Sequence, residues 1–263
     1  MDNRLYIVEG LPCSGKSTTA RFISENLKKG KVCFVDEGSG NHPADYEFHA
    51  FISEHNFALL PSNEQDIISA CALHTERGYI VPLSRIQGEL FDMLMKYKIY
   101  DFLPWQVEMP LMLEKWQSFV RNADKDTMYV FNCVLLQNPM CETMMRFGFS
   151  SEQSYDYIRK ISDIITPMNP VVIYLKNDDI SLCVKRTSGE REGWLNGVID
   201  YHVNSAYGRS IGASGFEGYI QCLEERQKRE LDILARLPVK SVLINNPHHN
   251  WAGAYEKIRK ILV

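Results

Sequence analysis

The chain has 263 residues, of which 45% are hydrophobic and 24% are charged, and its formal net charge is −4 at pH 7. This size suits one large α/β domain or a domain with a lid, and the acidic balance argues against nucleic-acid binding, which uses a basic surface. No apolar run approaches the roughly 18 residues of a membrane span, and no signal-peptide pattern precedes the first strand. Seven widely spaced cysteines without a C-x-x-C pair indicate free thiols, so we expect a cytoplasmic protein.

The first elements form a strand–helix–strand pattern. Arg4–Glu9 is apolar and predicts a buried strand. A helix follows over Ser17–Lys28, with Gly30 as its stop signal, and Lys31–Val35 predicts a second strand. This βαβ unit implies a parallel sheet with a right-handed crossover.

The stretch from residue 40 to 125 contains mainly helical patterns. Gly38–Pro61 is irregular, and Ser62 with Gln65 resembles a capping box that opens a helix to about Arg77. Further helices are predicted over Gln87–Lys96 and Leu111–Arg121. We interpret residues 40–125 as a helical insertion that forms the acceptor site, rather than as a separate domain.

Strands and helices alternate again in the second half of the chain. Strands are predicted over Thr127–Val134, Pro170–Leu175 and Ser241–Asn245, and helices over residues 150–165, 178–186, 216–237 and 252–262. The alternation predicts an α/β fold with a doubly wound, mainly parallel five-stranded sheet of P-loop NTPase topology. We expect one domain over residues 1–263.

A phosphate-binding pattern lies between the first strand and the first helix. Residues 10–17, GLPCSGKS, match G-x-x-x-x-G-K-[ST] at every fixed position. The glycines permit a backbone whose N–H groups hold phosphate oxygens, Lys16 would reach the β- and γ-phosphates, and Ser17 would coordinate Mg²⁺. The pattern therefore predicts ATP and Mg²⁺ as cofactors. The predicted nucleotide-binding residues are Gly10, Pro12, Cys13, Ser14, Gly15, Lys16, Ser17 and Thr18.

Three longer stretches resemble the thymidylate kinases and the related deoxynucleoside kinases. They are YIVEGLPCSGKSTTARFISENLKKGKVCFVDEG near the start, PVVIYLKNDDISLCVKRTSGER from residue 170, and CLEERQKRELDILARLP followed by SVLIN. The resemblance implies a distant member of the P-loop nucleoside and nucleotide kinase superfamily. It also implies a lid at residues 185–214, whose Arg186 and Arg191 close over the transferring phosphate; arginine's planar fork suits this role.

One position departs from the family pattern. Family members carry an Asp-Arg pair after the third strand, where this chain has Asn132 and no nearby arginine. Another carboxylate could act instead, the acceptor could need no strong base, or transfer could be lost. Asp36 and Glu37 follow the second strand, at the edge of the sheet where ligands bind. The deoxynucleoside kinases have a glutamate there that deprotonates the acceptor, which implies Glu37, then Asp36, as the base.

Together these patterns predict an ATP-dependent kinase that phosphorylates a small molecule, with nucleosides and nucleotides among the candidates. We expect no nucleic-acid or membrane partner, and a homodimer stays open. A regulatory nucleotide-binding protein and an NTPase that works with a partner protein are the alternatives. Glu9 could support magnesium-bound water or pack structurally, and Gln137 and Asn138 are weaker candidates for substrate contact.

Overall fold

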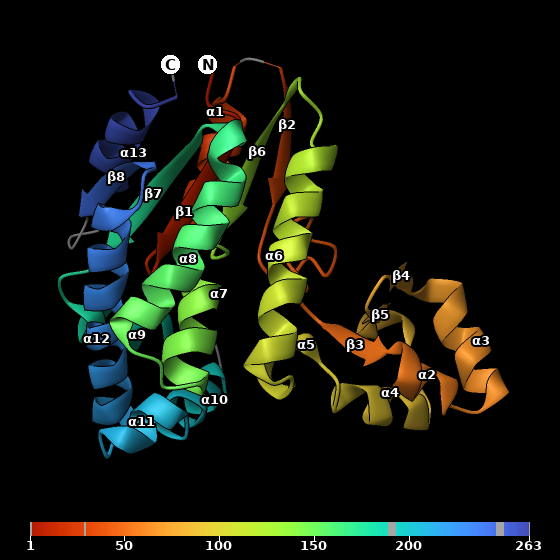
Figure 1. Ribbon diagram of the computed structural model, residues 1–263. Helices are drawn as coiled ribbons and strands as arrows, with labels where there is room; N and C mark the ends of the chain where they lie inside the picture. The colour runs from red at the N-terminus through yellow and green to blue at the C-terminus, as the bar shows by residue number, and fades with distance from the viewer. Residues whose placement is uncertain (1, 29, 189–192, 246–249, 263) are drawn as a thin grey trace. The chain divides into compact units, whose positions relative to one another are not determined.

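The segments predicted as strands pair in parallel in the order β2–β6–β1–β7–β8 (Figure 1). The computed structural model describes residues 2–28, 30–188, 193–245 and 250–262. Apolar side chains on both faces explain why β1 and β7 read as continuous hydrophobic runs, as expected for a parallel sheet covered on both sides. The strands are β1 (Leu5–Gly10), β2 (Lys31–Val35), β6 (Thr127–Asn132), β7 (Pro170–Lys176) and β8 (Lys240–Asn245).

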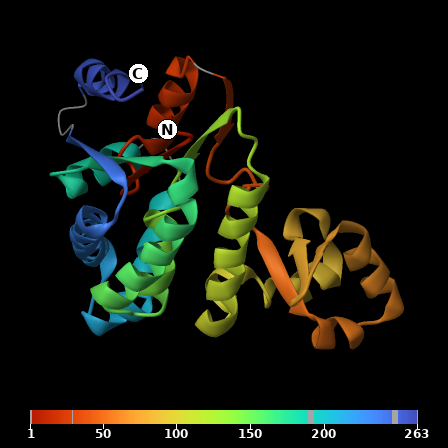
Figure 2. The same ribbon diagram turned by 45° about the horizontal axis from the view of Figure 1, so that its top comes forward.

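Helices cover both faces of this sheet (Figure 2). One face carries α1 (Lys16–Asn26) and α13 (Trp251–Arg259), where Ile23 and Ile258 join a buried cluster with side chains of β1, β6, β7 and β8. The other face carries α8 (Ser151–Ile165) and α12 (Gly215–Arg236). The prediction of a doubly wound α/β fold with P-loop kinase-like topology is therefore confirmed.

Polar contacts fix α12 to β7. The buried Tyr174 hydroxyl of β7 donates to Glu230 Oε2 at 2.6 Å, and Arg226 Nε lies 3.1 Å from Glu230 Oε1. Gln227 accepts from the Asn177 N–H and donates to the Asn177 carbonyl, both at 2.8 Å. The hydrogen bonds of Tyr174 and Gln227 satisfy polar groups that would be costly to bury unpaired, and they set the position of the chain where β7 ends.

Shorter helices connect these layers. Their bounds are α7 (Gln137–Met140), a π-helical segment (Cys141–Arg146), a 3-10 turn (Thr166–Met168), α9 (Ile180–Ser188), α10 (Trp194–Val203) and α11 (Ala206–Ser210).

Contacts separate the chain into two units, Met1–Glu37 with Gln117–Val263, and Gly38–Trp116. The second unit has its own core, in which Ile52, Ile68, Val81 and Leu94 are buried together. It contains an antiparallel sheet in the order β3–β5–β4. Its elements are β3 (His49–Ser53), α2 (Glu54–Ala58), α3 (Ser62–Cys71), β4 (Leu73–Thr75), β5 (Gly78–Pro82), a 3-10 turn (Leu83–Arg85), α4 (Gly88–Met95), α5 (Ile99–Phe102) and the start of α6 (Trp105–Asn122).

The insertion contains helices, as predicted, but its sheet was missed. The helix from Ser62 was expected to reach about Arg77, whereas α3 ends at Cys71 because the next residues pair as a hairpin, with Thr75 opposite Gly78. The prediction of one domain with an insertion at 40–125 and a lid at 185–214 stays a prediction. Within the described residues, no helix combines the length and apolar character that crossing a membrane requires.

Candidate functional site

The loop between β1 and α1 has the backbone that its glycines predict. Gly10 has φ 140° and Gly15 has φ 89°, and Cys13 between them has φ 69°. A Cβ on Gly10 would lie 2.6 Å from the Leu175 carbonyl oxygen, so the loop also needs glycine for close packing against β7. Leu11 anchors the loop in a buried cluster with Val184 of α9 and Leu223 of α12.

The Lys16 side chain is buried within this loop and bonds to it. It is 7% exposed, and its ammonium group donates to the Leu11 carbonyl at 2.8 Å. Lys16 thus bonds to a carbonyl of the loop and not to a carboxylate. An anion that enters the loop can therefore replace this carbonyl as the partner of the ammonium group. Ser17 and Thr18 are exposed at the start of α1, whereas Pro12, Cys13 and Ser14 are half-buried.

A polar cluster lies where β2 and β6 end, beside this loop. Asn132 Nδ2 donates to Asp36 Oδ1 at 2.7 Å and to Ser17 Oγ at 3.2 Å. Asn132 Oδ1 accepts from the Glu37 N–H at 3.0 Å. The parallel register places Val35 opposite Phe131, so the residues after both strands meet. The structure thus brings together Ser17 at the start of α1, Asn132 at the end of β6, and Asp36 and Glu37, which follow β2.

Two residues after β6 hold the Glu37 carboxylate. The Cys133 thiol donates to Glu37 Oε2 and the Gln137 amide donates to Glu37 Oε1, both at 3.2 Å. Burial raises the pKa of Cys133 well above its usual range, so this thiol remains protonated and can donate. Glu37 itself is exposed. It is therefore an oriented carboxylate that an incoming molecule can reach.

Glu9 is wholly buried and acts as a structural link. Its carboxylate accepts from the N–H groups of Leu135 at 2.7 Å, Leu136 at 3.0 Å and Gln137 at 3.1 Å. Burial raises the pKa of Glu9 to about 7, and the N–H bonds oppose this shift. Of the two roles considered for Glu9, the geometry favours packing over contact with magnesium-bound water.

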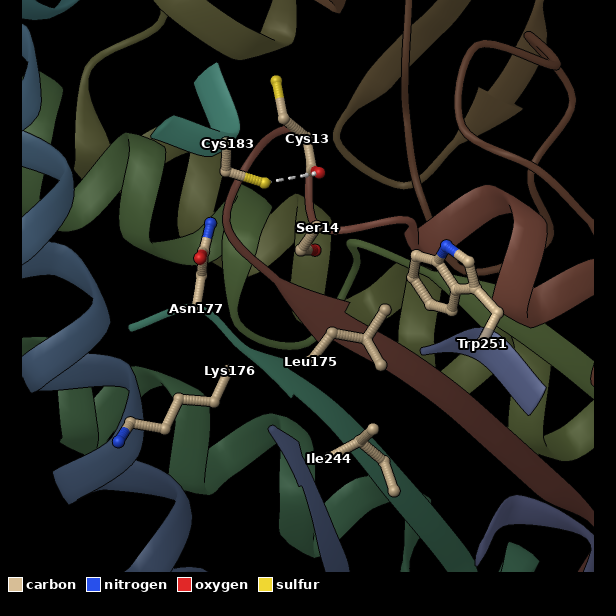
Figure 3. Close-up of a pocket in the computed structure, with 8 residues that line it drawn as sticks. All are labelled: Cys13, Ser14, Leu175, Lys176, Asn177, Cys183, Ile244 and Trp251. Atoms are coloured by element: carbon tan, nitrogen blue, oxygen red, sulfur yellow. Dashed lines mark hydrogen bonds between the residues drawn. The ribbon is translucent and has the colours of Figure 1, made fainter. Parts of the chain in front are cut away.

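The predicted lid is described only in part. Arg186 is exposed near the end of α9. Cys183, one helical turn before it, donates its thiol to the Cys13 carbonyl at 3.1 Å, which ties α9 to the phosphate loop (Figure 3). Arg191 lies outside the described residues, so its predicted role stays a prediction.

A small pocket lies behind the loop (Figure 3). Its volume is about 20 Å³, room for a water molecule rather than a nucleobase. Trp251 of α13 stands against Gly15, where an added Cβ would meet the indole at 2.4 Å. The pocket is lined by Cys13, Ser14, Leu175, Lys176, Asn177, Cys183, Ile244 and Trp251.

The residues beside the loop fit a hydrated magnesium ion. Among the described residues, no group of three or more His, Cys, Asp or Glu side chains is arranged to hold a metal by itself. Mg²⁺ does not require one, because it usually keeps several waters and is held by one or two protein oxygens with substrate phosphates. Ser17 Oγ and the Asp36 carboxylate are hard oxygen donors of that kind, joined through Asn132.

Sequence reasoning missed two features of this site. The bond between Asn132 and Asp36 depends on side-chain placement across two strands that are distant in the chain. The contact of Trp251 with Gly15 joins the two ends of the chain, and no local pattern could have indicated it. The strand ends were the signal that located the cluster, but they could not show which atoms meet.

The G-x-x-x-x-G-K-S loop at the carboxyl edge of this parallel sheet gives the chain a P-loop, kinase-like fold. No protein-family model and no curated protein matches the sequence. Among solved structures, a thymidylate kinase from Candida albicans is similar at 12% identity and a TM-score of 0.46, over 98% of this chain and 92% of that chain. A sugar kinase from Janibacter sp. HTCC2649 is similar at 11% identity and a TM-score of 0.37, over 98% and 94% of the two chains. Both likenesses concern the fold alone.

Proposed function

We propose that this protein is an ATP-dependent phosphotransferase that moves the γ-phosphate of ATP, bound with Mg²⁺, to a small-molecule acceptor. The observation that carries the proposal is the 3.2 Å contact between Ser17 Oγ and Asn132 Nδ2. Through it, the phosphate loop adjoins the carboxylates of Asp36 and Glu37. Phosphoryl transfer depends mainly on positioning and charge stabilisation, and these are the parts that it requires.

Each part has a role in the proposed reaction. The loop N–H groups and Lys16 hold the triphosphate, with Lys16 leaving the Leu11 carbonyl for the phosphate oxygens. Glu37 takes the proton of an acceptor hydroxyl. The hydroxyl oxygen then bonds to the γ-phosphorus, the bond from phosphorus to the β–γ bridging oxygen breaks, and ADP leaves. Arg186 and Arg191 would neutralise charge on the transferring phosphate.

The acceptor belongs to small hydroxyl- or phosphate-bearing molecules, including nucleosides and nucleotides. We propose no nucleic-acid or membrane partner and leave a homodimer open. All seven cysteines lie in the described part of the chain and are free thiols. This suits a protein that works in the reducing cytoplasm.

A regulatory nucleotide-binding protein is the second candidate. The observation that favours it is Asn132, which lacks the carboxylate that kinases of the resembled family carry after this strand. Such a protein would bind ATP without transferring phosphate.

Thermal melting and labelled phosphate separate these functions. ATP with Mg²⁺ should raise the melting temperature of the wild type, and Lys16→Ala should remove that rise. Label from γ-labelled ATP should then appear on one compound in a screen of nucleosides, nucleotides and sugars. A protein that ignores millimolar ATP would end the proposal. Binding without transfer would favour the regulatory role, and steady phosphate release without an acceptor would indicate a partner-dependent NTPase.

A further inference from the structure

In the polar cluster beside the phosphate loop, the carboxylates of Asp36 and Glu37 follow β2, whereas the resembled family carries an aspartate at the position of Asn132 in β6. Asn132 is 1% exposed, and its amide has three partners in the cluster. Its nitrogen donates to Asp36 Oδ1 and Ser17 Oγ, and its oxygen accepts from the Glu37 N–H. The amide therefore fixes the Asp36 carboxylate next to the hydroxyl that the loop presents.

The amide at position 132 is matched to the carboxylate at position 36. An aspartate at 132 would have no N–H to offer Asp36, and two carboxylates would face each other at a distance now occupied by a 2.7 Å hydrogen bond. Asn132 thus supplies the N–H donor that an aspartate could not, and it holds the Asp36 carboxylate beside Ser17.

A neighbouring side chain independently indicates a missing partner. Gln137 is 8% exposed, and its amide nitrogen donates to Glu37. Its amide oxygen is buried and has no hydrogen-bond partner among the described residues. Buried polar atoms are rarely left unpaired, so this oxygen, held at the same cluster, calls for a donor such as water or a ligand hydroxyl.

We propose that Asp36 is the carboxylate that binds the hydrated magnesium ion of the nucleotide, with Asn132 as the residue that positions it beside Ser17. The inference rests on the proposed nucleotide binding and moves a role from the end of β6 to the end of β2. Mg²⁺ keeps several of its waters, and a carboxylate can hold the ion through them. Asn132 is accordingly a positioning residue and not a lost catalytic one.

The test is a magnesium titration of nucleotide binding. The melting temperature is followed with a fixed concentration of a non-hydrolysable ATP analogue while MgCl₂ is varied. Asp36→Asn should raise the MgCl₂ concentration for half-maximal effect by about 10-fold or more, as expected for loss of a metal-supporting carboxylate. Asp163→Asn on α8 is the matched control and should titrate like the wild type. Manganese bound with the analogue, counted by electron paramagnetic resonance, should fall in parallel.

The exchanged pair tests the role of Asn132. In Asp36→Asn combined with Asn132→Asp, the new amide at 36 can donate to the new carboxylate at 132, which can still accept from the Glu37 N–H. This double variant should recover most of the magnesium response that Asp36→Asn loses. An unchanged titration in Asp36→Asn would overturn the assignment of the ion to Asp36. Failure of the exchanged pair to recover, while it still binds the analogue, would overturn the positioning role. Failure of the wild type to bind nucleotide would instead reject the proposed function.

Discussion

The Lys16 ammonium group donates to the Leu11 carbonyl at 2.8 Å, so the phosphate loop is closed around its own lysine. Lys16→Met keeps most of the apolar stem but removes the charge. We expect the unliganded variant to melt near the wild-type temperature, because the 7% exposed stem stays packed. ATP at about 100 times the wild-type dissociation constant stabilises the folded wild type by about 2.7 kcal/mol. The variant should lose most of this stabilisation, which is measured as a smaller rise in melting temperature on addition of ATP. An equal rise in melting temperature with ATP in both proteins would show that the Lys16 ammonium group does not bind the phosphates.

The Glu37 carboxylate gives a second prediction. Glu37→Gln removes the proton acceptor while leaving the phosphate loop intact. With the acceptor found in the labelling screen, turnover should fall by about 10²–10⁴-fold, the usual contribution of a general base. The melting shift with ATP should not change. Glu25→Gln, the same chemical change at an exposed position of α1, is the control and should turn over like the wild type.

Gly15 should be intolerant of a side chain for two separate reasons. Its φ of 89° is strained for any other residue, and an added Cβ would meet the Trp251 indole at 2.4 Å. Gly15→Ala should therefore cost at least about 1–3 kcal/mol of unfolding free energy and weaken ATP binding. In Gly197→Ala, nothing lies within 4 Å of the new Cβ. That control in α10 should be neutral or stabilising by up to about 1 kcal/mol. Chemical denaturation of both variants distinguishes local strain from a general intolerance of alanine.

His202 makes stability depend on pH. It is buried in α10, its ring meets Tyr219 edge-on, and Nδ1 lies 2.7 Å from the Val198 carbonyl oxygen. Burial first, and then the Arg226 charge, lowers the pKa of His202 to about 4. Between about pH 6.5 and pH 4 the unfolded chain binds a proton here that the folded chain does not, so stability falls as pH falls. The loss amounts to about 3 kcal/mol across this range.

His202→Phe keeps a flat ring against Tyr219 and cannot titrate. Its unfolding free energy should therefore lose less between pH 6.5 and pH 4 than that of the wild type. Burial also lowers the pKa of His42, in the other unit, to about 3. The unfolding free energy of His42→Phe should therefore likewise fall less than that of the wild type as the pH is lowered. If the His202→Phe and wild-type curves remain parallel, His202 does not titrate differently in the two states.

The sequence was sufficient for the sheet and insufficient for the insertion. Residues of β7 are apolar on both faces, and Ser150 with Gln153 forms the capping box that opens α8, so local patterns and the fold agree there. Ser62 with Gln65 looks the same in sequence, but Pro61 is the N-cap and no side-chain cap forms. The strand after α3 is three residues long and depends on its hairpin partner. Its formation therefore could not be deduced from periodicity.

The candidate site also has one part that the sequence predicts and one part that it does not. The phosphate loop is a contiguous motif whose conformation follows from Gly10 and Gly15, so its place was predictable. Asn132 was recognised as a departure, yet its meaning depends on the atom that it faces, which is Asp36 Oδ1. In the sequence, asparagine at position 132 looks like the loss of a carboxylate. The pairing of β2 with β6 shows instead that the Asn132 amide donates to a carboxylate on the neighbouring strand end, Asp36.

The hydrogen bonds to the Glu9 carboxylate should slow the exchange of three backbone amide protons just after β6. Leu135, Leu136 and Gln137 precede or begin a helix of four residues, a place where N–H groups usually exchange quickly with solvent deuterium. Here all three donate to one buried acceptor on β1. Their deuterium uptake should therefore follow the opening of the central sheet, which makes this turn a kinetic reporter on the strand that carries the phosphate loop.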